Sequence, residues 1–176
     1  MTSEINTPKI VTIVGKSNSG KTTLLEKIVR ELTGRGVNIG SVKHAHDGFE
    51  MDKTGKDSWR HRQAGAASTL VIADGKVALL KDDASPEVDK MLTYLQDRDI
   101  IMAEGFKTLA LPKIEVFRKD SVHEHPLCME DKNLVAFVTD SDFRPDVPVF
   151  GLEEIARIAD FIQAHFLGRH HQDASS

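Results

Sequence analysis

Eight consecutive residues near the start of the chain, Gly-Lys-Ser-Asn-Ser-Gly-Lys-Thr at positions 15–22, restrict the possible folds more than any other segment. They match the pattern G-x-x-x-x-G-K-[ST] without a substitution and follow a short, β-branched, apolar run at residues 10–14. The residues after the turn include an apolar set at helical spacing: Leu24, Leu25, Ile28, Val29 and Leu32. A buried central strand, a glycine-rich turn and a helix in this order predict a phosphate-binding P-loop.

Each residue type in the turn has a physical role in holding a polyphosphate. Gly15 and Gly20 permit backbone angles that other residues avoid, so successive N–H groups can point inward and form an anion site. Lys21 adds a positive charge near the β- and γ-phosphates, and the Thr22 hydroxyl can ligate Mg²⁺. We therefore expect a nucleoside triphosphate to be bound by Gly15, Lys16, Ser17, Asn18, Ser19, Gly20, Lys21, Thr22 and Thr23.

A second carboxylate is expected at the end of a neighbouring strand, where it holds Mg²⁺ directly or through water. Residues 100–103 predict a short buried strand, with Asp99 before it and Glu104 after it. Ligands bind at the carboxyl ends of parallel strands, so we expect Glu104, rather than Asp99, to be the metal-side carboxylate. A solvated glutamate at a strand end is the alternative. Gly105 beside it favours the functional interpretation, since it indicates a close backbone approach.

The rest of the chain predicts strands that alternate with helices. Further strands are expected at residues 38–42, 114–117 and 134–138, and further helices at 57–64, 86–96 and 152–166. Asp74-Gly75 separates two β-rich runs, which is a strong hairpin signal and adds antiparallel pairing. We therefore expect an α/β fold, a three-layer P-loop NTPase with a mostly parallel, mixed sheet and helices on both faces.

The size and composition of the chain exclude several classes of protein. With 176 residues, a single P-loop nucleotide-binding domain is expected at 9–168, between a flexible N-terminus at 1–8 and a disordered tail at 169–176. The formal net charge of -4 disfavours a nucleic-acid-binding surface. One cysteine permits no internal disulfide, and no apolar run is long enough for a signal peptide or a membrane span. We expect a cytoplasmic protein with no membrane partner.

Polar residues are unusually dense after the second predicted strand, from Lys43 onward. Here the sequence resembles the molybdopterin-guanine dinucleotide biosynthesis protein B family, MobB, in three blocks. They are the phosphate loop, the stretch from Lys43-His44 to Gly65-Ala66, and Glu104-Gly105-Phe106-Lys107. The blocks span most of the first two thirds of the chain. The middle block is the most specific of the three, because the phosphate loop alone marks a very large superfamily.

This resemblance implies a GTP-binding, weakly hydrolysing homodimer that assists a partner enzyme in attaching GMP to molybdopterin. The ligands that it implies are GTP and Mg²⁺. The implied partners are that guanylyltransferase, a second copy of the chain and, as a further candidate, molybdopterin. No N-K-x-D guanine-reading motif occurs in the sequence. Asp140, after the strand at 134–138, can accept from the guanine N1 and N2 donors, and an ordinary turn aspartate is the alternative.

Lys43 and His44 follow a predicted strand, so either can reach the γ-phosphate or the attacking water. The expected catalytic residues are therefore Lys21, Glu104 and His44. For each ionisable residue of this block, a solvated loop charge is the alternative.

Aspartates are frequent in the middle block. Asp47 joins Thr22 and Glu104 as an expected metal ligand, and Asp52 and Asp57 are further outer-shell candidates. On the short helix, Arg60 and Arg62 are weaker candidates, and Trp59 is interpreted as a packing or dimer-contact residue.

Two other functions remain open on the sequence alone. A nickel or zinc metallochaperone GTPase is suggested by His44-Ala45-His46 and by His123-Glu124-His125 with Cys128, although neither group supplies four local ligands. A small-molecule kinase would use the same phosphate loop. It would need an arginine-bearing lid, whereas the candidate arginines are scattered along the chain at Arg60, Arg62, Arg118 and Arg144.

Overall fold

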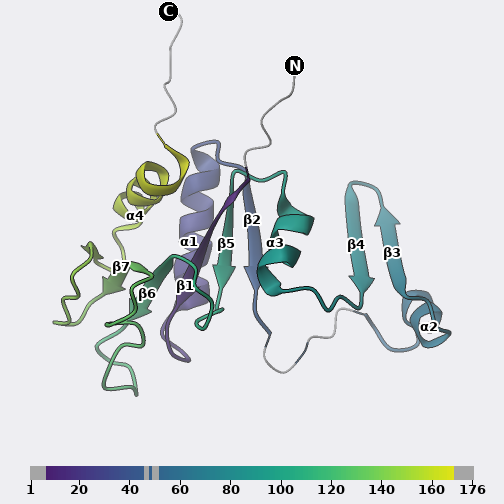
Figure 1. Ribbon diagram of the computed structural model, residues 1–176, viewed down its shortest axis with the longest axis horizontal. Helices are drawn as coiled ribbons and strands as arrows, with labels where there is room; N and C mark the ends of the chain where they lie inside the picture. The colour runs from purple at the N-terminus through teal and green to yellow at the C-terminus, as the bar shows by residue number, and fades with distance from the viewer. Residues whose placement is uncertain (1–6, 46–47, 49–51, 169–176) are drawn as a thin grey trace, which may run out of the picture. The chain divides into compact units, whose positions relative to one another are not determined.

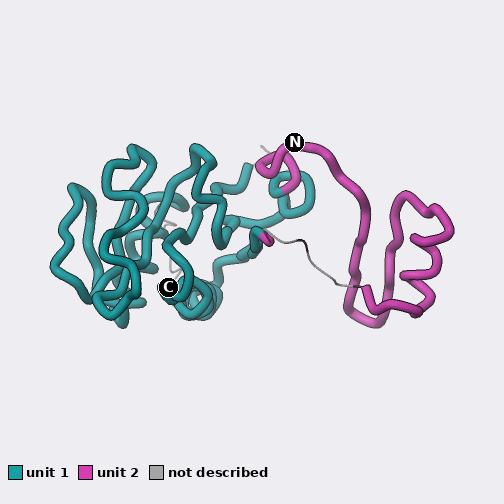
Figure 2. Tube along the Cα trace, turned by 90° about the horizontal axis from the view of Figure 1, so that it is seen from below, with its two compact units in different colours: residues 1–44, 91–176 teal, residues 45–90 magenta. Residues whose placement is uncertain are grey.

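The computed structural model describes residues 7–45, 48 and 52–168. The chain forms two compact units, which Figure 2 colours separately: unit 1 comprises residues 1–44 and 91–176, and unit 2 comprises residues 45–90. The single domain predicted at 9–168, with its flexible start and disordered tail, stays a prediction, since most of the two end segments lie outside the described residues.

Unit 1 is built on a six-stranded sheet in the order β2-β5-β1-β6-β7-β8, and every neighbouring pair in it is parallel. The phosphate-loop strand β1 has β5 on one side and β6 on the other, as predicted for a central strand. The strands are β1 (Lys9–Val14), β2 (Ile39–Lys43), β5 (Ile100–Glu104), β6 (Lys113–Phe117), β7 (Leu134–Thr139) and β8 (Val149–Phe150).

The main core of unit 1 lies between the sheet and two helices, α1 (Lys21–Gly34) and α4 (Ile155–Ile162). Alternate residues of the strands, such as Val11 and Ile13 of β1, point into this core beside Ile28 and Ile158. Figure 1 shows α1 behind the strands and α3 (Glu87–Leu95) in front of them. The predicted α/β class, with helices and a mostly parallel sheet, is confirmed.

Helix α3 ends in unit 1, where its last turn covers β2. Gly40 gives room for that contact, because a Cβ there would lie 2.9 Å from Leu95 Cδ1 and the Leu95 side chain would have to shift. After α4 the helix continues as a π-helical turn, η1 (Gln163–Leu167), and the strand β8 is an element that the sequence patterns did not predict. A two-residue strand is too short for apolar alternation to mark it.

Unit 2 contains the helix α2 (Asp57–Gln63) and the strands β3 (Ser68–Ala73) and β4 (Lys76–Lys81). The strands pair antiparallel around Asp74-Gly75, which confirms the predicted hairpin. They form a separate two-stranded sheet, so the expectation of one mixed sheet is wrong: the antiparallel pairing is confined to unit 2. The hairpin signal is local and carries no information on which strands its edges join.

No helix in the described part of the chain combines the length and the apolarity that crossing a membrane requires.

Candidate functional site

The phosphate loop connects β1 to α1 at the carboxyl end of the sheet, as Figure 1 shows. Three of its residues have a positive φ: Gly15 at 147°, Asn18 at 61° and Gly20 at 94°. Glycine adopts such angles freely, and asparagine tolerates the left-handed region better than most residues. These angles turn the chain within a few residues, so that it enters α1 with the helix N-terminus open to an anion.

Gly15 is required for space as well as for its backbone angle. A Cβ at this position would lie 2.5 Å from both the Ser19 Oγ and the carbonyl oxygen of Val116 in β6. The loop is therefore pressed against the neighbouring strand. Ser19 is almost fully buried, and its Oγ has no hydrogen-bond partner among the described residues. A buried hydroxyl without a partner is uncommon, and it fits a loop shaped around a polar ligand.

Lys21 is the first residue of α1, and its Nζ donates to the carbonyl oxygen of Lys16 at 2.8 Å. The ammonium is thus held against the phosphate loop. Burial lowers the pKa of Lys21, and the positive charges of Lys107 and Lys43 lower it further, whereas Glu104 acts in the opposite direction. A polyphosphate would relieve this repulsion, because it would bring negative charge to a cluster of three lysines.

Thr22 and Glu104 come together from positions 82 residues apart in the sequence. The Thr22 hydroxyl donates toward both carboxylate oxygens of Glu104, at 2.9 Å each. Glu104 ends β5, the strand beside β1, so the sheet brings the two groups to the same edge. The hydroxyl and the carboxylate supply the hard oxygen ligands that Mg²⁺ prefers, beside the loop where the phosphates would lie.

Two further predicted residues lie beside Glu104. Lys43 is its partner in the register of β2 and β5, and the backbone N–H of His44 donates to the carbonyl oxygen of Glu104 at 3.0 Å. The His44 ring lies 4.7 Å from the ring of Phe106, and a Cβ added at Gly105 would lie 3.1 Å from the His44 Cβ. The structure therefore brings Lys21, Thr22, Lys43, His44 and Glu104 into one region.

Asp140 follows β7, two strands away from β1 on the side opposite Glu104. Its Oδ1 accepts a hydrogen bond from the backbone N–H of Lys119 at 2.7 Å, which ties the loop after β6 to the end of β7. Asp140 thus has a structural contact of its own. Its predicted role as a reader of guanine stays a prediction.

Two charged residues on β6, Lys113 and Glu115, were not predicted to matter, yet they are 1% and 0% exposed. The Lys113 Nζ lies 2.8 Å from Asp131 and donates to the Leu109 carbonyl oxygen at 2.7 Å. Both residues point away from the main core, because Ile114 between them belongs to that core. The sequence signal that could have singled out these two residues is the presence of charges at alternating positions in an otherwise apolar strand.

Glu115 lies beside the start of the phosphate loop, since it is the register partner of Val14, the residue before Gly15. Its carboxylate accepts from the backbone N–H groups of Leu127 and Cys128, at 2.5 and 2.8 Å. Burial raises the pKa of Glu115, while these two hydrogen bonds and the charge of Lys16 act against that rise. The buried carboxylate therefore fastens the segment after β6 to the sheet beside the phosphate loop.

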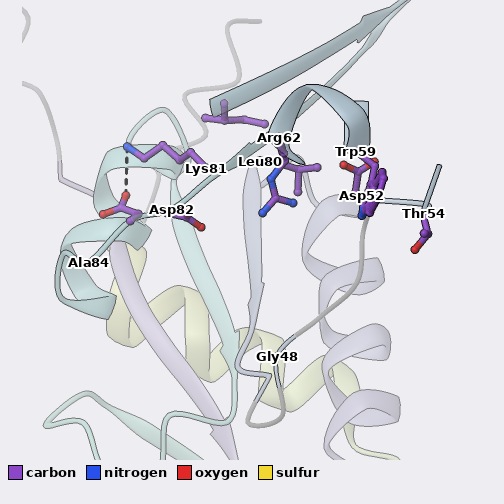
Figure 3. Close-up of a pocket in the computed structure, with 11 residues that line it drawn as sticks. Gly48, Asp52, Thr54, Trp59, Arg62, Leu80, Lys81, Asp82 and Ala84 are labelled. Carbon is purple, nitrogen blue, oxygen red and sulfur yellow. Dashed lines mark ion pairs between the residues drawn. The ribbon is translucent and has the colours of Figure 1, made fainter. Parts of the chain in front are cut away.

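Unit 2 carries the other charged candidates of the middle block. Asp52, Trp59 and Arg62 line a hollow of about 760 Å³ within this unit, which Figure 3 shows with the Lys81–Asp83 ion pair at its edge. The Ser58 hydroxyl donates to Asp52 Oδ1 at 2.7 Å, whereas Asp52 Oδ2 is buried without a hydrogen-bond partner in the described part of the chain.

Other candidates of this block are more exposed. Asp57 and Arg60 lie 3.9 Å apart on the surface of α2. Asp47 and His46 lie outside the described residues.

The features that suggested other functions are dispersed. Among the described residues, no group of three or more His, Cys, Asp or Glu side chains is arranged to hold a metal ion. Cys128 is buried, and burial together with nearby Glu115 and Asp131 raises its thiol pKa to about 11. His125 stacks edge-on with Phe143 at 6.0 Å. The arginines are divided, with Arg60 and Arg62 in unit 2 and Arg118 and Arg144 in unit 1.

Comparison with known proteins gives a consistent result. Residues 10–140 match the family model of molybdopterin guanine dinucleotide synthesis protein B. The chain is 36% identical, over 162 residues, to a molybdopterin-guanine dinucleotide biosynthesis adapter protein of Haemophilus influenzae, covering 89% of this chain and 90% of that protein. The adapter protein of Escherichia coli is 35% identical over 153 residues, covering 83% and 86%. The crystal structure of Bacillus subtilis MobB superimposes with a TM-score of 0.73 at 27% identity, covering 92% of this chain and 99% of that one.

Proposed function

The chain belongs to the family of molybdopterin guanine dinucleotide synthesis protein B, and from this premise we propose that it is an adapter that binds GTP with Mg²⁺. In this role it assists a guanylyltransferase that attaches GMP to molybdopterin in the cytoplasm. The relatives' names support the adapter role, and the geometry of the phosphate loop supports the nucleotide.

The observation that carries the nucleotide proposal is the pairing of Thr22 with Glu104 at the open end of α1. The loop amides and Lys21 would bind the phosphates, and the Thr22 hydroxyl would be a direct ligand of Mg²⁺. Glu104, which already contacts that hydroxyl, would hold the ion directly or through water. The bound ion would bridge phosphate oxygens and neutralise part of their charge.

Hydrolysis by this site is proposed to be slow. The cations that act on Lys21 are Lys107 and Lys43. Arg118 lies beside Gly20, but it follows β6 on the other side of β1 from Glu104, so it is not placed as a finger at the proposed γ-phosphate end. His44 is the candidate expected from the sequence for orienting a water, and its ring packs against Phe106. An adapter that keeps its triphosphate can present a stable bound state to a partner.

A homodimer is supported by the hairpin of unit 2. Leu70 is the register partner of Leu79, and Ile72 that of Val77, so all four side chains lie on one side of the hairpin. This apolar face (Leu70, Ile72, Val77 and Leu79) is exposed at 53%, 71%, 68% and 45%, respectively. An exposed apolar face of this kind favours association. We propose a second copy as its occupant, because two-fold symmetry would pair the face with an identical one.

Molybdopterin is proposed to dock in the hollow of unit 2. A pterin ring is flat and carries N–H donors, which suit the Trp59 ring and the buried Asp52 Oδ2, an oxygen that has no hydrogen-bond partner among the described residues. Arg62 lines the same hollow and can bind the phosphate of the pterin. Since Trp59 is the only tryptophan, a pterin phosphate should quench the intrinsic fluorescence, and less so in Asp52→Asn. Unchanged fluorescence at saturating pterin would exclude this location.

The nucleotide site is tested by Lys21→Ala in calorimetric titrations with GTP and Mg²⁺. We expect the variant to lose affinity by at least about 100-fold, because the ammonium charge faces the phosphates. Lys9→Ala is the matched control, since this exposed lysine begins β1 at the end far from the loop. Near-normal affinity of the Lys21 variant would refute the site.

A further inference from the structure

A shallow hollow of about 50 Å³ lies in unit 1 beside the phosphate loop. Gly20 and Thr23 at the start of α1, Arg118 after β6, and Leu152 and Glu153 after β8 are among its lining residues. The hollow has room for one edge of a planar ring rather than for a whole nucleoside.

The direction of the bound triphosphate follows from the order of the strands. Glu104 and Thr22, which mark the β- and γ-phosphate end, lie on the β5 side of β1. The hollow is lined from β6 and from the segment after β8, on the other side of β1. A nucleotide whose terminal phosphates lie near Glu104 therefore directs its ribose and base toward the hollow.

Lys27 and Glu153 close the hollow as an ion pair, with the Lys27 Nζ 2.6 and 2.9 Å from the two carboxylate oxygens. The Glu153 side chain is 81% exposed and that of Lys27 is 34% exposed, so a ligand can reach both. The pair presents a donor next to an acceptor at the place where the base edge would lie.

This donor and acceptor match the edge of guanine. Guanine carries the O6 acceptor next to the N1–H and N2–H₂ donors, whereas adenine presents a donor and an acceptor in the reverse order. Lys27 can donate to O6, while Glu153 can accept from N1–H and N2–H₂. The same two residues would face adenine with donor against donor and acceptor against acceptor, which disfavours it.

Resting on the GTP site proposed above, the geometry points to the Lys27–Glu153 pair as the determinant of guanine specificity. Asp140, the carboxylate expected from the sequence, already accepts the Lys119 N–H. The proposed guanine-binding carboxylate is therefore Glu153, after β8, in place of Asp140, after β7.

The test compares GTP, inosine triphosphate and ATP, each with Mg²⁺, by calorimetry on the full chain. Inosine triphosphate lacks only the 2-amino group. The wild-type protein should bind it about 10-fold more weakly than GTP, and ATP about 100-fold more weakly. Glu153→Gln should weaken GTP binding roughly 10- to 100-fold and remove the distinction between GTP and inosine triphosphate.

Two further variants complete the design. Lys27→Glu with Glu153→Lys keeps an ion pair but reverses it, so the preference for GTP over ATP should disappear while circular dichroism stays unchanged. Glu26→Gln is the matched control, since Glu26 is an exposed carboxylate on the same helix, paired with Arg30 at 3.0 Å, and it should keep the preference.

Each adverse outcome has a distinct meaning. If GTP binds and depends on Lys21 but Glu153→Gln keeps the GTP preference within about twofold, this inference is wrong and the proposed function stands. If only Asp140→Asn loses the preference for GTP over ATP, Asp140 and not Glu153 recognises the guanine base. If the wild-type protein binds no nucleotide, the proposed function and this inference are both overturned.

Discussion

The two units of the molecule differ in how far their apolar side chains are buried. Unit 1 contains every described hydrophobic residue that is buried, including Ile28, Ile114 and Ile162 at 0% exposure. In unit 2 the only described residue that is buried is Thr69. Unit 1 therefore has a core of its own, whereas unit 2 is a hairpin and a short helix whose apolar side chains are largely exposed.

Because of this contrast, branched apolar residues have different effects in the two units. Branched apolar residues in β1 stabilise the fold by entering the core, at about 25 cal/mol per Å² of buried apolar surface. Similar residues in β3 and β4 gain no such burial within the described chain, and an isolated two-stranded hairpin is marginal in water. An apolar strand in a sequence therefore indicates a buried surface without indicating which molecule buries it.

The largest expected effect is on association through the apolar face of unit 2. Ile72→Asp together with Val77→Asp should weaken self-association by about 100-fold or more, because the substitutions place charges where apolar surface would be buried. Analytical ultracentrifugation over a concentration series measures this. GTP affinity should remain, since unit 1 is unchanged.

Val122→Asp is the matched control for this prediction. Val122 is an apolar residue of unit 1 that is 89% exposed, so it tests whether any exposed apolar side chain has the same effect. A double variant that sediments like the wild-type protein would contradict the role of the hairpin. Equal weakening of self-association in both variants would mean that exposed apolar residues in general, and not the apolar face of unit 2, cause the association.

A smaller effect is expected inside unit 1, at Glu115. Glu115→Ala removes the acceptor for the N–H groups of Leu127 and Cys128, of which the second is buried, so the free energy of unfolding should fall by about 2–4 kcal/mol. Urea denaturation followed by circular dichroism gives the value. Glu130→Ala, an exposed carboxylate of the same segment, should change stability by less than about 0.5 kcal/mol. Similar stabilities for the two variants would show that the buried carboxylate does not hold the segment.

The smallest effect concerns Cys128, which has a thiol pKa of about 11. Because this pKa is raised above the usual 9.0, the folded protein keeps its thiol protonated at pH 8 and should react with iodoacetamide far more slowly than the urea-unfolded chain. The unfolded thiol ionises first, so stability should decline as the pH rises above about 9. Mass spectrometry of the timed reaction checks this. Equal labelling of folded and unfolded protein would place Cys128 in a more open environment than the core of unit 1.

Local sequence patterns predicted much of unit 1. The strand, turn and helix around Gly15 and Gly20 follow from backbone chemistry within a few residues, and the structure has these elements where they were expected. Glu104 was selected because it ends a buried strand, and it does lie beside Thr22. The predicted elements and the position of Glu104 agree with the structure because each depended on local periodicity and on one general rule of parallel sheets. The role of Glu104 as a metal ligand stays a prediction.

The parts that were missed depend on contacts between distant residues. Nothing in the sequence around Glu115 indicates that the backbone N–H of Cys128 will donate to its carboxylate. In the same way, nothing around Lys113 indicates that Asp131 will pair with its ammonium group. The separation of the hairpin from the main sheet was missed for the same reason. The pairing of Lys27 with Glu153 joins residues 126 positions apart, so no motif could place that acceptor beside the phosphate loop.

The position of β5 between β1 and β2 has a consequence for synthesis of the protein on the ribosome. The first two strands of the sheet leave the ribosome early, but each must wait for β5 before it gains that neighbour. Glu104 follows Thr22 by 82 residues, a delay of roughly 4–16 s at about 5–20 residues per second. During that interval the nascent chain carries a finished phosphate-loop sequence whose Thr22 hydroxyl still lacks the Glu104 carboxylate. A messenger truncated before codon 100 would therefore yield apolar strands that lack their shared neighbour, which makes the fragment a substrate for chaperones and proteases.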